Sequence, residues 1–179
     1  MPEMLNEAQR ELAARAARFA EEVLLPLAGT DPAAARRQVV SASKAAGFFP
    51  MTQPTDLGGA TAGALDLTIV RDELAARNAP FTGAVFGPGP GVLAGVQGPL
   101  RKSHLEPLLA GEKRGAFGFT EPDDAPRPTT AEDGGDVWVV SGQKSYVTGG
   151  ADADFINTLV QIPDQGAAML VIDTASSGV

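Results

Sequence analysis

The spacing of apolar residues changes near Gly115, and this change constrains the fold more than any other feature of the sequence. Before Gly115, apolar side chains such as Leu5, Leu12 and Phe19 recur at the three- and four-residue steps of one helix face. After it, short apolar runs alternate with turn residues, as in strands. Helices and strands are therefore segregated along the chain, which predicts an α+β protein and argues against a doubly wound nucleotide-binding fold.

The first part of the chain is expected to be helical. Asn6 with Gln9 forms a capping-box pattern, and Asp31-Pro32 supplies an N-cap acceptor followed by a ring suited to a first helical turn. The helices expected from these signals and the apolar period span about 5–25, 32–46, 62–77 and 99–111. The apolar stretch 81–97 is expected to be helical only in part, because Gly87-Pro88-Gly89-Pro90-Gly91 interrupts it.

The last third of the chain is predicted to form strands joined by tight turns. The expected strands cover 115–120, 136–142, 144–148, 154–162 and 167–173. Asp133-Gly134-Gly135 and Asp164-Gln165-Gly166 are turn sequences, because glycine supplies the positive φ that a tight reversal needs. We therefore expect antiparallel hairpins, with a helical N-terminal domain over 1–112 and a β-rich domain over 113–179.

Charge and composition exclude several classes of function. Residues 1–115 hold 12 basic and 12 acidic side chains, whereas 116–179 hold 2 and 10, so the net charge of −8 lies in the strand-forming part. A surface this acidic cannot neutralise phosphates, which argues against nucleic-acid binding. The chain has no cysteine, which excludes disulfide, thiolate and iron–sulfur chemistry. No apolar run is long enough to span a bilayer and no leader pattern is present, so we expect a soluble, cytoplasmic protein without a membrane span.

Three motifs resemble catalytic signatures without the residues that would complete them. The glycines of 87–91 lack a preceding strand, and the intervening prolines remove phosphate-binding donors. Ser41-Ala42-Ser43-Lys44 has the spacing of a penicillin-binding nucleophile, but no companion motif follows. His104 is the single histidine, and it is expected to be a solvent-exposed residue of a surface helix with no nucleophile to serve.

Two strand ends carry the best candidate binding residues. Gly118-Phe119-Thr120-Glu121-Pro122 ends one strand, and Ser141–Gly150 contains Tyr146, Val147 and Thr148 before flexible glycines. Together the two segments can present hydroxyl donors and aromatic faces to a planar heteroaromatic ligand.

The order of these segments resembles the acyl-CoA dehydrogenase family over all 179 residues. The segments that carry the resemblance are Leu108–Glu112, Phe119–Pro122 and Gly142–Asp154, supported by the Gly58-Gly59 loop and the apolar run Ala168–Asp173. The resemblance implies a helical N-terminal domain, an antiparallel β-barrel-like middle domain, and FAD held by the middle domain. It implies an oxidoreductase acting on CH–CH groups, which desaturates acyl-CoA or another acyl thioester at the α,β position.

The same resemblance implies which residues contact FAD. Phe117, Phe119 and Thr120 would line one side of the flavin, while Tyr146, Val147 and Thr148 would form the second wall, with Thr148 nearest to flavin N5. Arg127 is the candidate for holding ligand phosphates, because Pro126 stands where the family has a serine and lacks both hydroxyl and amide hydrogen. Asp123 and Asp124 add negative charge to the same loop.

The family's carboxy-terminal helical bundle, which supplies the catalytic base, has no counterpart in these residues. No catalytic residue is assigned, weak FAD binding is expected, and the chain alone is expected to be inactive. A homo- or hetero-oligomer with a chain that supplies the bundle would complete the enzyme. Two alternatives stay open: a non-catalytic interaction module derived from the family that pairs with a partner chain, and a flavin-dependent hydroxylase on the same fold.

Overall fold

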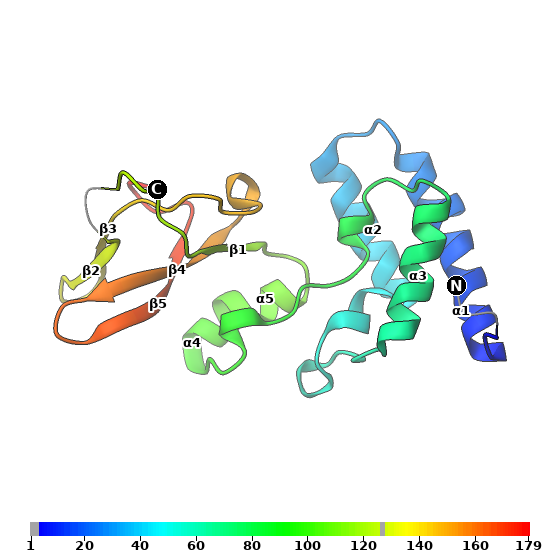
Figure 1. Cartoon of the computed structure of the whole chain (residues 1–179), viewed down its shortest axis with the longest axis horizontal. Coiled ribbons are helices and arrows are strands. Elements are labelled where there is room, and N and C mark those ends of the chain that lie inside the picture. The colour runs from blue at the N-terminus through cyan, green and yellow to red at the C-terminus, as the bar shows by residue number, and fades with distance from the viewer. Residues whose placement is uncertain (1–3, 126–127) are drawn as a thin grey trace. The chain divides into compact units, whose positions relative to one another are not determined.

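The computed structural model describes residues 4–125 and 128–179, which form two compact units (Figure 1). The helical unit comprises the described residues up to Gly89, and the strand unit comprises those from Pro90 onward. Each unit has its own cluster of buried apolar side chains. Within the described residues, no helix is both long and apolar enough to cross a membrane. The domain division expected at residue 112 stays a prediction.

The helices of the helical unit begin and end where local signals predict. Helix α1 (Glu7–Phe19) continues through a π-helical turn, Ala20–Leu24, and a 3-10 turn, Leu25–Leu27. Its capping box is confirmed, since Gln9 N donates to Asn6 Oδ1 at 2.8 Å and Asn6 N donates to Gln9 Oε1 at 3.0 Å. Helix α2 (Pro32–Ala46) begins after Asp31, whose carboxylate accepts from Ala34 N, and helix α3 spans Ala64–Ala76.

The core of the helical unit is apolar and centred on Phe48. The Phe48 side chain is 1% exposed, and its ring meets Phe19 edge to face at 5.2 Å. The buried cluster contains Ala16, Phe19, Ala20, Leu24, Leu27, Ala35, Val39, Phe48, Met51, Val70, Leu74 and Val85. The hydroxyl of buried Ser43 donates to Val85 O and so joins α2 to the segment that follows α3. Burial of this cluster stabilises the unit through the hydrophobic effect.

The stretch 81–97 has little helix, as the glycine and proline run predicts. Only short 3-10 turns form, at Thr82–Ala84 and Gly91–Leu93. Gly87 N donates to Phe49 O at 2.8 Å, and a Cβ at Gly87 would lie 2.7 Å from Phe49 Cε1. A glycine is therefore required at position 87 by close backbone approach, and its role is packing.

The strand unit contains one helical run and a five-stranded sheet. The run comprises α4 (Gly98–Leu100), a π-helical turn, Arg101–Leu105, and α5 (Glu106–Leu109). The strands are β1 (Gly115–Gly118), β2 (Thr130–Asp133), β3 (Trp138–Ser141), β4 (Phe155–Ile162) and β5 (Gly166–Asp173). Strand β4 pairs with β5 antiparallel along its whole length, and β1 and then β2 share its other edge.

The expected α+β class is confirmed, with the one correction that the sheet is mixed and not antiparallel throughout. Strand β1 runs parallel to β4, with Gly115 opposite Phe155, and β2 runs parallel to β4 at Thr130. In the chain, the β2–β3 hairpin lies between β1 and β4. After this hairpin, β4 runs beside β1 and in the same direction as β1. The predicted strand 144–148 is absent, because its backbone leaves the extended region at Tyr146, where φ is 54°. Strand β2 escaped prediction because Thr-Ala-Glu-Asp lacks apolar alternation.

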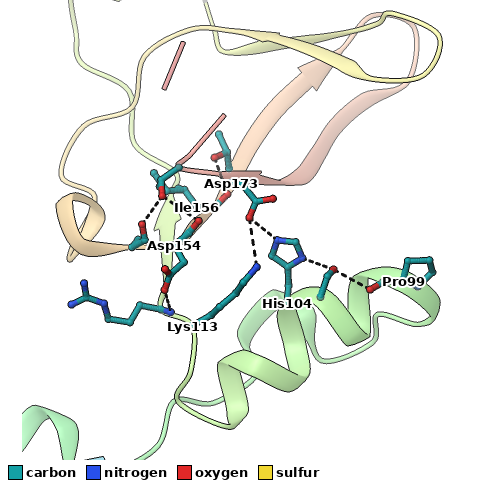
Figure 2. A network of polar contacts seen from close by, with 11 residues as sticks. Pro99, His104, Lys113, Asp154, Ile156 and Asp173 are labelled. Atoms are coloured by element: carbon teal, nitrogen blue, oxygen red, sulfur yellow. Dashed lines mark hydrogen bonds and ion pairs between the residues drawn. The ribbon is translucent and has the colours of Figure 1, made fainter. Parts of the chain in front are cut away.

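The helical run packs on the sheet through His104, which is 8% exposed, so the expectation of a solvent-exposed histidine is wrong (Figure 2). His104 Nε2 donates to Asp173 Oδ1 at 3.0 Å, and Ser103 Oγ lies 2.8 Å from Nδ1. The imidazole meets the Phe155 ring edge to face at 4.9 Å. Asp173, at the end of β5, also lies 3.9 Å from Lys113 Nζ. His104 is thus a buried, hydrogen-bonded link between helix and sheet.

Candidate functional site

Phe117 of β1 and Phe119, which directly follows the strand, form a stacked pair. Their ring centroids are 5.9 Å apart with an interplanar angle of 16°. The two side chains are 48% and 57% exposed, respectively, which is unusual for large apolar residues so close together. The alternation of the strand directs Ala116 and Gly118 to the other, buried side. This geometry leaves two aromatic side chains accessible to a ligand.

A hydrogen bond joins the two segments that the sequence singled out. Ser145 N donates to Thr120 O at 2.8 Å, so the loop that carries Tyr146 and Thr148 begins beside the end of β1. Tyr146 is 92% exposed and has a left-handed backbone, and Thr148 is exposed in the turn before Gly149. The predicted residues Phe119, Thr120 and Tyr146 therefore come from adjoining segments.

Glu121 accepts hydrogen bonds beside the point where these two segments meet. Its Oε1 accepts from Lys144 Nζ at 2.8 Å and from Thr129 N at 2.7 Å. These bonds favour the charged carboxylate, and they lower the pKa of Glu121 from its ordinary value of 4.5 to about 2, with the Lys144 hydrogen bond as the largest cause. The segments around residues 121, 129 and 144 are thus held together by one carboxylate oxygen.

Lys144 lies behind the aromatic pair. Its side chain is 10% exposed, and its Cγ would stand 3.4 Å from a Cβ placed on Gly118. The aliphatic stem therefore crosses the side of β1 opposite to Phe117 and Phe119. Beyond it, Nζ donates to Phe119 O at 3.2 Å as well as to Glu121. The ammonium satisfies polar groups at the strand end, and its stem packs beside Gly118.

The predicted residues do not converge on one enclosed cavity. Phe119 and Thr120 line a hollow of about 310 Å³ with Glu121 and Lys144. Val147 lines a second hollow of about 560 Å³, which Lys144 also lines and whose apolar wall includes Trp138, Ile156 and Leu170. Arg127, the predicted phosphate-binding residue, and Pro126 lie outside the described residues. The assignment of Phe117, Phe119, Thr120, Tyr146, Val147, Thr148 and Arg127 to a ligand stays a prediction.

Sequence reasoning missed the residues that organise the site. Glu121 and Lys144 are 23 positions apart, and nothing in the spacing shows that they pair. The described residues contain no cluster of three or more His, Cys, Asp or Glu side chains that could hold a metal ion. The site offers aromatic rings, hydroxyls and main-chain groups, which suit a planar organic ligand.

The sequence of the chain is similar to a known protein family and to several curated proteins. A profile of the family described as "Acyl-CoA dehydrogenase, N-terminal domain" matches residues 6–112. The 3-(aryl)acrylate reductase of Clostridium sporogenes is 28% identical, and the match covers 96% of this chain and 49% of the reductase. The chain thus spans about half the length of the curated relatives it matches.

Two solved structures share the fold. The ChsE4-ChsE5 complex from Mycobacterium tuberculosis has a TM-score of 0.75 at 23% identity, covering 99% of this chain and 50% of the matched chain. A glutaryl-CoA dehydrogenase from Mycobacterium smegmatis in complex with FADH2 has a TM-score of 0.68 at 25% identity, covering 97% and 47%. Helices followed by a mixed sheet are therefore the arrangement of a known fold.

Proposed function

Because the chain belongs to the acyl-CoA dehydrogenase family, we propose that its strand unit holds FAD, and that the protein's reaction is α,β-dehydrogenation of an acyl thioester. The observation that carries the proposal is the exposed aromatic pair Phe117 and Phe119, joined through Thr120 and Ser145 to the loop of Tyr146. Support comes from the related glutaryl-CoA dehydrogenase, whose structure is a complex with FADH2. The related 3-(aryl)acrylate reductase acts, by its name, on the α,β double bond that dehydrogenation forms.

The residues present fit the ring system of FAD. An isoalloxazine is flat, apolar on its faces and rich in hydrogen-bonding atoms along its edges. Phe117 and Phe119 offer exposed apolar rings, and Thr120 and Thr148 are exposed residues that carry hydroxyls. Ser145 Oγ is buried and has no hydrogen-bond partner among the described residues, so the junction retains an unused donor. Asp123 and Asp124 are exposed and would repel the cofactor's phosphates, which is consistent with weak binding.

When bound, FAD supplies the hydride acceptor. The chain's own residues would bind and orient it: aromatic rings exclude water from one face, and hydroxyls and main-chain groups fix the edge. Glu121 is not suited to remove the substrate's α-proton, because a carboxylate with a pKa of about 2 that already accepts two hydrogen bonds is a poor base. No residue is assigned that role.

Absorbance of the purified protein tests the proposal. We expect the visible absorbance bands of a bound flavin, either as purified or after FAD is added. Phe119→Ala should weaken FAD binding by about fivefold, since stacking on one aromatic side chain contributes roughly 1 kcal/mol. Leu65→Ala, which truncates an exposed apolar residue of the helical unit, is the matched control and should leave FAD binding unchanged. Equal affinity in both variants would contradict the proposed site.

An activity assay tests the absence of a base. We expect these 179 residues alone to show no turnover of acyl-CoA with an artificial electron acceptor. Turnover would mean that a carboxylate of this chain removes the α-proton.

A second candidate is a non-catalytic module that pairs with a partner chain. It is favoured by the acidic residues Asp123 and Asp124 beside the site and by the structural neighbour, which is a complex of two proteins. A colourless protein that ignores added FAD, and whose sedimentation coefficient rises when an acyl-CoA dehydrogenase-like chain is added, would favour this candidate over the first.

A further inference from the structure

We propose that Lys144 and Glu121 form a positioning clasp, which holds the aromatic pair of β1 and the loop of Tyr146 at a fixed separation for the flavin. The clasp consists of Lys144, Glu121 and the groups that they bind, Phe119 O and Thr129 N. The inference rests on the proposed function, because the ligand that benefits is FAD. Neither side chain would touch the reacting atoms, so both are positioning residues.

The position of Lys144 behind β1 is the first step of the argument. Its stem packs against Gly118, on the side of the strand opposite to Phe117 and Phe119. Its Nζ then donates to Phe119 O, which fixes the peptide that carries the exposed Phe119 ring. Any movement of Lys144 is therefore transmitted to the main chain at the aromatic pair, without contact between Lys144 and the ligand.

The charges are the second step. Lys144 is nearly buried, and Glu121 is its ion-pair partner at 2.8 Å. Removal of either member leaves a charge in a partly desolvated position, so the two side chains hold each other in place. Thr129 N donates to the same Glu121 oxygen, which joins the chain just before β2 to the clasp. Three segments thus meet at a single carboxylate.

The backbone of Tyr146 is the third step. Its φ of 54° is a left-handed conformation that a bulky residue adopts only when the surroundings impose it. The flanking Ser145 N is bound to Thr120 O, and Lys144 is anchored at two acceptors. The Ser145–Thr120 hydrogen bond and the clasp together therefore fix the chain immediately before Tyr146, whose ring is exposed.

Fluorine NMR tests the clasp without any cofactor. Tyr146 is the only tyrosine, so a chain labelled with 3-fluorotyrosine has one tyrosine fluorine site. We expect one narrow resonance in the wild-type chain and a broadened or displaced one in Lys144→Met, which keeps most of the stem and removes the charge. Lys102→Met is the matched control: it removes one exposed lysine of the same unit and should leave the resonance unchanged.

FAD titration then tests the consequence for the ligand. Lys144→Met and Glu121→Gln should each weaken FAD binding by about tenfold, and the double variant by no more than the larger single effect, because both remove the same interaction. Lys102→Met should bind FAD as the wild type does. Additive losses in the double variant, or wild-type affinity and resonance in Lys144→Met, would overturn the proposal.

The two proposals fail in different ways. A wild-type chain that binds no FAD overturns the proposed function, and the role of the clasp in holding flavin is overturned with it. A chain that binds FAD equally well with and without Lys144 overturns the clasp alone. Circular dichroism monitors folding, and if Lys144→Met does not fold, Glu121→Gln carries the test, since an amide oxygen still accepts from Thr129 N.

Discussion

The two units differ in how many of their apolar side chains are buried and how many are exposed. The main cluster of the helical unit contains twelve buried residues, and that of the strand unit contains four. Among the described residues, the large exposed apolar side chains number three in the helical unit and eight in the strand unit, including Phe117, Phe119, Trp138 and Tyr146. The helical unit therefore buries most of its large apolar residues, whereas the strand unit leaves many of them accessible at its surface.

The largest expected effect is loss of the helical core. Phe48→Ala should lower the free energy of unfolding by about 3–5 kcal/mol, because Phe48 is 1% exposed and Phe19 packs against its ring. Circular dichroism at 222 nm follows mainly the helices, and fluorescence of the single tryptophan, Trp138, follows the strand unit. We expect the first transition to move and the second to stay. Equal shifts would mean that the two cores unfold together.

The second effect concerns the smaller core of the strand unit. Asp173→Ala should lower its free energy of unfolding by about 1–3 kcal/mol, because the buried His104 Nε2 loses its acceptor. Denaturation followed by Trp138 fluorescence measures the change. Asp136→Ala, an exposed acidic residue of the β2–β3 turn, is the control and should change stability little. If Asp136→Ala is destabilised as much as Asp173→Ala, the change in net charge, and not the lost hydrogen bond to His104, explains the effect.

The third effect depends on pH, because it arises from the ionisation of Glu121 in the strand unit. The pKa of Glu121 falls from 4.5 to about 2 on folding, so its contribution to stability is fully present above about pH 4.5 and is lost as the pH falls toward 2. We expect the stability difference between wild type and Glu121→Gln to shrink over that range. Denaturant titrations of both proteins at several pH values, followed by Trp138 fluorescence, measure it. A difference independent of pH would contradict the ionic role of Glu121.

The smallest expected effect on stability is at the aromatic pair itself. Phe119→Ala should change the free energy of unfolding by only about 0.5 kcal/mol, because its ring is 57% exposed. The same variant is expected to lose FAD affinity. A loss of several kcal/mol in thermal or chemical denaturation would show that Phe119 belongs to the core, and the contrast between the units would then weaken.

Local signals explain which parts of the fold were predictable. The capping box of Asn6 and Gln9 and the start of α2 at Asp31-Pro32 depend on residues three or four positions apart, and both are confirmed. The pairing of β1 with β4 joins positions forty residues apart, and the burial of His104 requires Asp173 from the far end of β5. Such contacts leave no periodic trace in the sequence, so the mixed sheet and the buried histidine could not be read from it.

In the candidate site, too, some residues were predicted from the sequence and others were not. Phe119, Thr120 and Tyr146 were predicted because aromatic and hydroxyl residues at strand ends are visible in the sequence. The Lys144 and Glu121 pair was not, because it joins side chains 23 positions apart that meet only in the folded chain.

The parallel pairing of β1 with β4 also sets an order of events during synthesis. Gly115 leaves the ribosome forty residues before its partner Phe155, and β4 must be present before β1 can form its ladder. Until then Phe117 and Phe119 belong to an unpaired strand, and closure over such a separation is slower than the formation of a local helix. We expect the helical unit to fold first, and molecular chaperones to meet the nascent chain at the β1 aromatic residues.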